Sequence, residues 1–292
     1  MTTVAPSPSP TLNFTPPPRR VPLSLKIANT MTGTAQLGWF LFGFGMIFVW
    51  SFAGHADYSF IEFYGERGRA LGVIDSVQPT SFTVDNARVM ANGYEFSAGG
   101  RTFHGVAYST GSAAAPGQKT WVEYIAGKPQ MSRIAGMRRA AVTPWVLVVV
   151  VIPLVGIGLV GFAWGGGRIE NQLLRDGILT TGVLKEKTAT NTSVNNARVY
   201  RMTFEFTARD GTRHKLTSFT NAPHRLSDEA REPLLYDPQT PERAYLLDNA
   251  PSRPKLDGGG ELLGRPVAAF FKLIIPVIVL ALNGLWALAQ VV

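Results

Sequence analysis

The sequence VDNARV at residues 84–89 returns as VNNARV at residues 194–199, and this repeat organises the whole chain. The same shift of 110 residues brings YEFSA, residues 94–98, onto FEFTA, residues 204–208. Over residues 72–98 it gives 11 identities in 27 positions without a gap. Chance does not account for this agreement, so the chain contains an internal duplication.

Each copy has the pattern of a small β-domain. Residues 94–96 and 204–206 alternate apolar and polar side chains with the period of a half-buried strand, so Glu95 and Glu205 are expected to face solvent. The dipeptides Gly99-Gly100 and Asp210-Gly211 follow, and such pairs supply the positive φ angles of tight hairpins. Further β-rich segments complete each copy. The pattern predicts a five-stranded antiparallel sheet or small barrel over residues 69–135 and again over residues 178–248.

Three long uncharged runs flank and separate the copies. Residues 27–54, 140–167 and 273–292 contain no Asp, Glu, Lys or Arg. About 20 apolar residues in a helix cross the hydrocarbon core of a bilayer, so each run holds one crossing. We expect transmembrane helices over residues 37–53, 142–164 and 267–289. The fold class is therefore an α+β membrane protein with three transmembrane helices and two repeated β-domains, and the lipid bilayer is its first expected partner.

The flanks of these runs indicate an orientation. Basic residues favour the cytoplasmic side, and eight of them lie on the flanks that an N-inside topology makes cytoplasmic, against six on the other flanks. The N-terminus is thus expected in the cytoplasm, with the two copies on opposite faces of the membrane. Seven prolines among the first 22 residues predict a disordered tail over residues 1–26. Lys272, the one charge inside a predicted span, is expected to anchor its helix at the headgroups.

Turn and core residues carry a resemblance to a known family. The second copy has Gly182-x-Leu184, Phe204-x-Phe206, Gly211 and Tyr236-x-Pro238-x-x-Pro241, and the first copy keeps Gly72, Tyr94, Phe96, Gly100, Tyr124 and Pro129. The first copy departs from the pattern at Ala126, where the second has Pro238. This resembles a family of bacterial membrane proteins catalogued only as a domain of unknown function. The resemblance covers roughly half of the chain. It implies a multi-pass protein of the bacterial inner membrane and no reaction.

Motifs for enzymatic chemistry are weak. Residues 156–161 spell the glycine pattern of dinucleotide-binding folds, but they lie inside an uncharged span, where glycines usually serve helix packing. Gly161 and Gly165 are predicted to form such a helix contact. The four histidines lack partners at metal-ligand spacing, and the chain contains no cysteine. A net charge of +8 is spread evenly, which does not favour nucleic acid. We therefore predict no catalytic, cofactor or metal site.

The repeated Asn86-Ala87-Arg88 and Asn196-Ala197-Arg198 remain as candidate residues. One interpretation is recognition, because an arginine beside an asparagine can hold an anionic group. The other is a turn into the second strand, with the arginine bonded to a nearby carbonyl or acid. We favour the structural interpretation of Asn86, Arg88, Asn196 and Arg198. For two copies that face different compartments, a shared ligand is harder to explain than a shared folding constraint.

Three functional hypotheses follow from the sequence. The first is a non-catalytic membrane protein whose β-domains bind a protein partner or a second copy, or support a membrane assembly. The second is a component of an oligomeric channel or transporter, which the absence of acids and bases in the spans argues against. The third is an enzyme with an unrecognised site in one β-domain.

Overall fold

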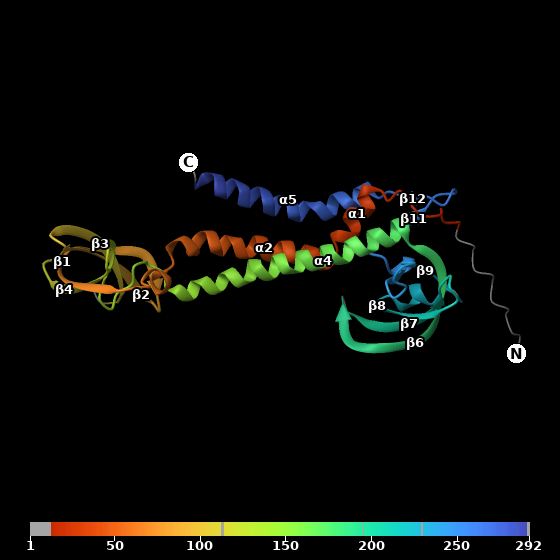
Figure 1. Cartoon of the computed structure of the whole chain (residues 1–292), viewed down its shortest axis with the longest axis horizontal. Helices are drawn as coiled ribbons and strands as arrows, with labels where there is room; N and C mark the ends of the chain where they lie inside the picture. Colours follow the sequence, from red (N-terminus) through yellow and green to blue (C-terminus); the bar gives the residue numbers. More distant parts are fainter. Residues whose placement is uncertain (1–12, 112–113, 195, 229, 291–292) are drawn as a thin grey trace, which may run out of the picture. The chain divides into compact units, whose positions relative to one another are not determined.

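The computed structural model describes residues 13–111, 114–194, 196–228 and 230–290. The chain falls into two compact units, one formed by Met1–Phe40 with Val155–Val292 and the other by Leu41–Leu154. Each unit contains one five-stranded antiparallel sheet together with parts of the long helices (Figure 1). The expected α+β fold with two separate β-domains is confirmed.

The described residues include three helical segments long and apolar enough to cross a membrane: Gly33–His55, Pro144–Asp176 and Pro266–Ala289. The first contains α2 (Gly33–Phe52), the second contains η2 (Pro144–Val150) and α4 (Val151–Asp176), and the third is α5 (Pro266–Ala289). Their large side chains face outward, as shown by Phe162 and Phe271, which are 77% and 64% exposed. Exposed apolar surface on this scale is typical of helices that cross a membrane.

The N-terminal segment differs from its prediction. The expected disordered tail reached Lys26, whereas α1 (Leu23–Thr30) already begins within it. Phe14, Val21 and Leu25 pack into an apolar cluster with Leu173, Leu174, Leu235, Leu247 and Leu262. The chain is therefore ordered by contact with the rest of its unit from residue 13 onward. The part of the predicted tail formed by residues 1–12 lies outside the described residues.

The first sheet has the strand order β3-β2-β1-β4-β5. Its strands are β1 (Arg67–Val84), β2 (Ala87–Ala98), β3 (Arg101–Thr110), β4 (Lys119–Ile125) and β5 (Lys128–Ile134). Beyond β5, Arg138 pairs with Tyr108 of β3 through two backbone hydrogen bonds of 2.7 and 3.0 Å. This pairing bends the two edges of the sheet toward each other, so the domain is close to the predicted small barrel.

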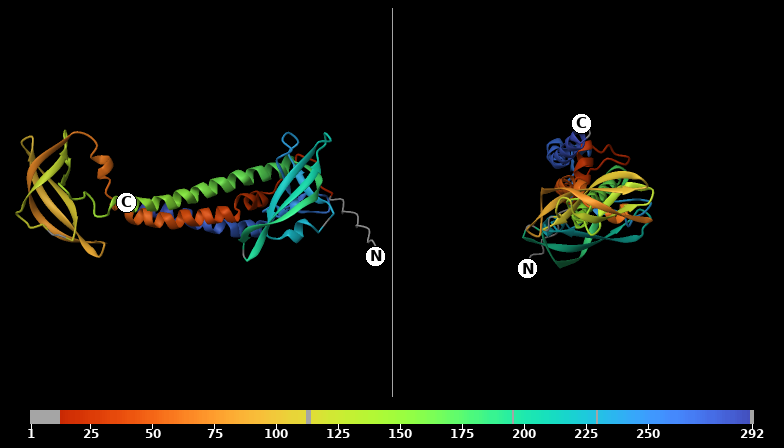
Figure 2. Two further views of the ribbon diagram at one scale, coloured as in Figure 1. Left: turned by 90° about the horizontal axis from the view of Figure 1, so that it is seen from below. Right: turned by 90° about the vertical axis from the view of Figure 1, so that its left-hand side faces the viewer.

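The second sheet repeats the first strand for strand. Its order is β10-β9-β6-β7-β8, formed by β6 (Ile178–Val194), β7 (Ala197–Thr207), β8 (Arg213–Thr220), β9 (Glu232–Tyr236) and β10 (Ala244–Leu246). The long paired strands β1–β2 and β6–β7 form a curved ribbon in each domain (Figure 2). The remaining short elements of this unit are η3 (Pro223–Leu226), η4 (Leu247–Asn249), β11 (Lys255–Leu256) and β12 (Leu262–Leu263).

The duplication extends to the irregularities of the two ribbons. The β1–β2 register shifts between Pro79 and Thr83, and the β6–β7 register shifts 110 residues later, between Ala189 and Ser193. Within these bulges, the Thr80 hydroxyl donates to the carbonyl of Val89 at 2.8 Å. The hydroxyl of Thr190 donates to the carbonyl of Val199, also at 2.8 Å. A repeated threonine thus closes the ladder where each strand bends.

The core of each domain is built from the alternating aromatic residues that the sequence indicated. Tyr94 and Phe96 are 0% and 3% exposed, and Phe204 and Phe206 are 0% and 2% exposed. Gly72 and Gly182 lie beside these residues, where a Cβ on Gly72 would lie 2.7 Å from the carbonyl oxygen of Glu95 and a Cβ on Gly182 would lie 2.7 Å from Cδ2 of Leu234. Close packing against backbone therefore favours glycine at Gly72, while at Gly182 a larger residue would have to displace the end of the Leu234 side chain.

Glycines also set the helix contacts, although not those predicted. Gly161 and Gly165, expected to form a helix contact, have no neighbour within 4 Å that a Cβ would meet. A Cβ on Gly38 of α2 would instead lie 2.7 Å from the carbonyl oxygen of Gly156 in α4. Gly167 approaches the backbone of Asn29 and Thr30 equally closely, with its Cβ position 2.7 Å from the Asn29 oxygen. The helices therefore pack through Gly38 and Gly167.

Lys272 lies in α5 and is half-buried. Its ammonium donates to the carbonyl oxygen of Ala28 in α1 at 2.8 Å. The side chain of Gln36 in α2 donates to the carbonyl oxygen of Lys272 itself at 2.7 Å. The predicted headgroup anchor is thus a bond between helices, because a carbonyl near the end of α1 satisfies the charge within the protein.

Candidate functional site

The structure places the repeated asparagines in hairpin turns. Asp85 and Asn86 have φ angles of +50° and +62°, and they form the two-residue loop between the paired residues Val84 and Ala87. Two consecutive positive φ angles define the hairpin turn whose twist matches the flanking strands. Asn196 has a φ of +60° at the equivalent place in the second copy. Asparagine is repeated here because it tolerates this backbone conformation better than most residues.

The repeated arginines have no such explanation. Arg88 and Arg198 are exposed at the starts of β2 and β7, opposite Thr83 and Ser193. Neither guanidinium forms a hydrogen bond or an ion pair within the described parts of the chain. The expected bond from Arg198 to a carbonyl or acid is therefore not found, and nothing in the structure explains the repetition of the arginine.

This difference changes the expected cost of substitutions at the turn. We expect Asn196→Ala to destabilise the second domain by about 1 kcal/mol, because alanine has no compensation for left-handed backbone geometry. Asn196→Gly is expected to be near neutral, and Arg198→Ala to stay within about 0.5 kcal/mol, as an exposed residue without contacts should. Pulse proteolysis of the full-length protein in urea measures all three. A loss at Arg198→Ala as large as that at Asn196→Ala would contradict the assignment.

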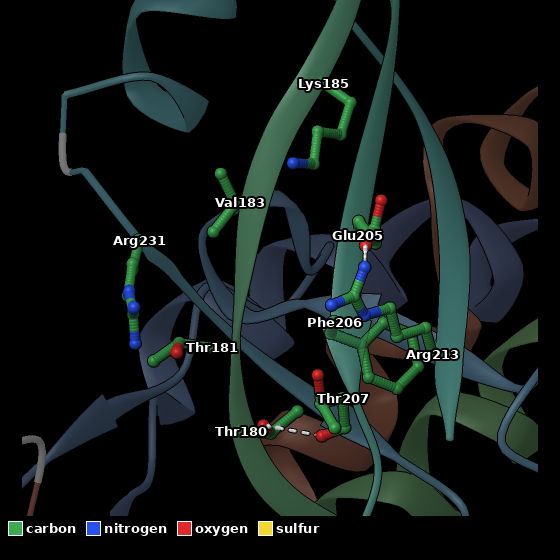
Figure 3. Close-up of a pocket in the computed structure, with 9 residues that line it drawn as sticks. All are labelled: Thr180, Thr181, Val183, Lys185, Glu205, Phe206, Thr207, Arg213 and Arg231. Carbon is green, nitrogen blue, oxygen red and sulfur yellow. Dashed lines mark hydrogen bonds and ion pairs between the residues drawn. The ribbon is translucent and has the colours of Figure 1, made fainter. Parts of the chain in front are cut away.

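A pocket on the second sheet gathers charged residues that the sequence did not single out. It has a volume of about 350 Å³ and is lined by Thr180, Thr181, Val183, Lys185, Glu205, Phe206, Thr207, Arg213 and Arg231 (Figure 3). We call this the sheet pocket. Its residues come from β6, β7, the start of β8 and the segment before β9. Because β6 pairs with both β7 and β9, residues distant in sequence meet on one face.

The charges of the sheet pocket are unevenly balanced. Arg213 reaches toward Glu205 on the neighbouring strand, with 3.6 Å between Nη1 and Oε1 (Figure 3). The side chain of Arg213 is 79% exposed, so this pair is screened by water and contributes little stability. Within the described residues, Lys185 and Arg231 form no ion pair. Three cations against one carboxylate, beside the threonine hydroxyls, make a surface suited to an anionic group.

The first domain does not repeat this arrangement. The residue aligned with Lys185 is Asp75, and the residue paired across β2 and β3 at the place of Arg213 is Thr102. The carboxylate is kept as Glu95. A cation is also kept at the place of Arg231, because Lys119 precedes Thr120, opposite Gly72, as Arg231 precedes Glu232, opposite Gly182. Both sheets fold with the same order and register, so the cations at Lys185 and Arg213 are not required by the fold. Comparing exposed positions of the two copies in the sequence would have pointed to Lys185.

Histidines in the β-domains show structural contacts. Nε2 of His214 lies 2.7 Å from the hydroxyl of Thr212, and Nδ1 lies 3.9 Å from Glu242. The strand pairing sets His104 opposite Glu95 but His214 opposite Phe206, so the two histidines are not equivalent. A search of the described residues finds no group of three or more acidic or histidine side chains arranged to hold a metal ion.

The chain was compared with protein-family models and with curated proteins. No family model matches the chain, and a search of curated proteins finds no match. The sheet pocket and the duplicated domains are therefore the features from which a function must be argued.

Proposed function

We propose that this chain is a non-catalytic, multi-pass protein of a bacterial inner membrane whose second β-domain binds an anionic group on a protein partner. The three apolar helices support insertion in a membrane, and the basic flanks of the sequence favour an N-terminus in the cytoplasm. In that orientation the second domain is cytoplasmic. The partner is a different protein or a second copy of this chain, and the binding surface is the sheet pocket.

The observation that carries this proposal is the excess of cations in the sheet pocket. Lys185, Arg213 and Arg231 line one pocket although they belong to separate segments. The first domain folds in the same way with Asp75 and Thr102 at two of these places. The positive charges of Lys185 and Arg213 line a concave surface and are not needed by the fold. This combination favours a role in binding. A guanidinium and an ammonium side by side hold a carboxylate or phosphate through several charge-assisted hydrogen bonds.

The channel hypothesis gains one observation from the structure. Glu170 lies within α4, which continues to Asp176 and so beyond the predicted span, and one of its carboxylate oxygens is buried. Glu170 lies three residues after the uncharged run of residues 140–167, so an ion or proton path would use this acid at its mouth and not at its centre. Conductance of vesicles reconstituted with the purified protein, compared with vesicles carrying Glu170→Gln, tests this second candidate directly.

The binding proposal is tested by giving the second domain the side chains of the first. The double variant Lys185→Asp with Arg213→Thr introduces the residues found at Asp75 and Thr102. Its control is Lys119→Asp with Arg101→Thr, which makes the same charge change at exposed positions of the first domain. We expect cross-linking in native membranes, followed by purification and quantitative mass spectrometry, to show partners that fall about tenfold or more only in the first variant. An identical set of cross-linked proteins in all three samples would refute the proposal.

A further inference from the structure

A second concave surface lies where the N-terminal segment crosses the end of α4. It has a volume of about 540 Å³ and is lined by Arg19, Arg20, Val21, Lys26, Arg168, Asn171, Gln172 and Arg175. We call it the basic cleft. Five of its eight residues are cations, and none is an acid. It is separate from the sheet pocket, with which it shares no residue.

Two of the five cations have structural roles. Arg19 is only 8% exposed and donates to the carbonyl oxygens of Leu174 and Gly177, at 3.2 and 2.8 Å. It thereby satisfies carbonyl groups at the C-terminal end of α4. A cation at this end also interacts favourably with the negative end of the helix dipole. Its guanidinium lies 3.9 Å from the ring centre of Phe14, and burial lowers its pKa from the usual value. Arg175 pairs with Asp176 at 2.9 Å. The contacts of Arg19 hold the N-terminal segment against α4, whereas the charge of Arg175 is paired within the helix.

The other three cations are available to a ligand. Arg20, Lys26 and Arg168 are exposed, and none of them forms an ion pair with an acid in the described part of the chain. The guanidinium of Arg168 lies 4.6 Å from the ring centre of Trp164, which orients it without neutralising it. Asn171 is held by Asn29, which donates to its Oδ1 at 2.9 Å. The cleft therefore combines fixed polar groups with three unneutralised charges.

The position of the cleft along α4 indicates what the ligand is. Arg168 is the first charged residue after the uncharged run of residues 140–167, so it marks the end of the hydrocarbon-spanning part of the helix. Trp164, one turn earlier, is a residue type that prefers the membrane interface. Apolar side chains remain exposed beside the cations, with Leu23 at 72% and Ile169 at 44%. The cations at the headgroup level match the anionic headgroup of a lipid molecule, and the exposed apolar residues beside them match its acyl chains.

We propose that the basic cleft binds the phosphate-bearing headgroup of an anionic phospholipid, an inference that rests on the membrane insertion proposed above. Arg168 and Arg20 offer forked N–H donors to the phosphate, and Lys26 adds a third positive charge. The side-chain amide of Gln172 serves the glycerol or ester oxygens, while the acyl chains lie along the apolar surface near Leu23. Basic pockets beside membrane helices on the cytoplasmic side suit such headgroups, and the topology inferred from the sequence places this cleft there.

The test compares lipids on the purified full-length protein. Detergent-solubilised protein is titrated with phosphatidylglycerol or with phosphatidylcholine, and native mass spectrometry counts the lipid retained. We expect one phosphatidylglycerol to bind at least about tenfold more tightly than phosphatidylcholine. Lys26→Gln with Arg168→Gln is expected to weaken phosphatidylglycerol binding about 30-fold, since each cation near an anionic headgroup contributes about 1 kcal/mol. Arg209→Gln with Lys255→Gln removes the same charge at exposed residues outside the cleft and should bind like the wild type.

Two results would overturn the inference. One is a preference for phosphatidylglycerol that persists in the Lys26→Gln with Arg168→Gln variant. The other is displacement of the lipid by millimolar inorganic phosphate, which would make the cleft a site for free phosphate. Lys26→Gln alone, at an exposed residue of α1, provides a milder variant with an expected loss of about fivefold. Cross-linking to a protein partner reports on the sheet pocket, so the failure of either proposal is recognised independently of the other.

Discussion

Cysteines introduced at Ser81 and at Asn191 are expected to be labelled from opposite sides of the membrane. The two residues are equivalent in the duplication and both are exposed on the long ribbons of their domains. One apolar helical segment, Pro144–Asp176, separates the two copies in the chain. If this segment crosses the membrane once, the chain changes sides between the copies, so we expect the copies to face different solvents. With the N-terminus in the cytoplasm, Asn191→Cys is cytoplasmic and Ser81→Cys is not.

The chain suits this measurement because it contains no cysteine, so the wild type is the unlabelled control. A membrane-impermeant maleimide applied to intact spheroplasts should label Ser81→Cys and leave Asn191→Cys unlabelled, and permeabilisation should make the two equal. The reverse pattern would keep the three crossings but invert the orientation. Equal labelling of both before permeabilisation would mean that Pro144–Asp176 does not cross.

The duplication made the β-domains predictable in unusual detail. Alternating aromatics at residues 94–96 predicted the core strand, and Gly99-Gly100 predicted a hairpin whose two glycines have φ angles of +58° and +78°. These features are local, because a turn or an alternating strand depends on neighbours in the chain. The second copy then showed the same strand and turn pattern at residues 204–211, which supported the prediction for both domains. The length of the first strand was not predictable, since β1 extends to Val84 through a bulge that hydrophobic alternation does not reveal.

Features that depend on contacts between distant segments were not predictable. The sheet pocket needs Lys185, Arg213 and Arg231 on one face, and only the strand order brings them together. The basic cleft needs residues near Arg19 to pack against α4, although a proline-rich segment is typical of disorder. The span ending at Trp164 was placed by hydropathy alone, whereas α4 continues to Asp176, and its last turns are held by Leu173 and Leu174 in an apolar cluster that forms only in the folded unit.

Gly38→Leu is expected to lower the stability of the helix packing by about 3 kcal/mol or more, while Gly161→Leu should have little effect. A Cβ on Gly38 would lie 2.7 Å from the Gly156 carbonyl oxygen and 2.9 Å from Cγ2 of Val160. The first obstacle is backbone, which cannot move without separating α2 from α4, and overpacking of this kind costs several kcal/mol. Helices in lipid associate mainly through close packing and hydrogen bonds, so a larger separation is poorly compensated.

Gly161 is the matched control because it lies in α4 and no atom within 4 Å would meet its Cβ. Both variants add the same side chain to a membrane-length helix and remove one helix-destabilising glycine. The thermal unfolding midpoint of each purified protein in the same detergent measures the difference. A midpoint lowered equally by both substitutions would indicate that Gly161 also contacts a helix, as the sequence pattern Gly161-x-x-x-Gly165 had suggested. A midpoint lowered only by Gly38→Leu assigns the α2–α4 contact to the glycine that the backbone geometry requires.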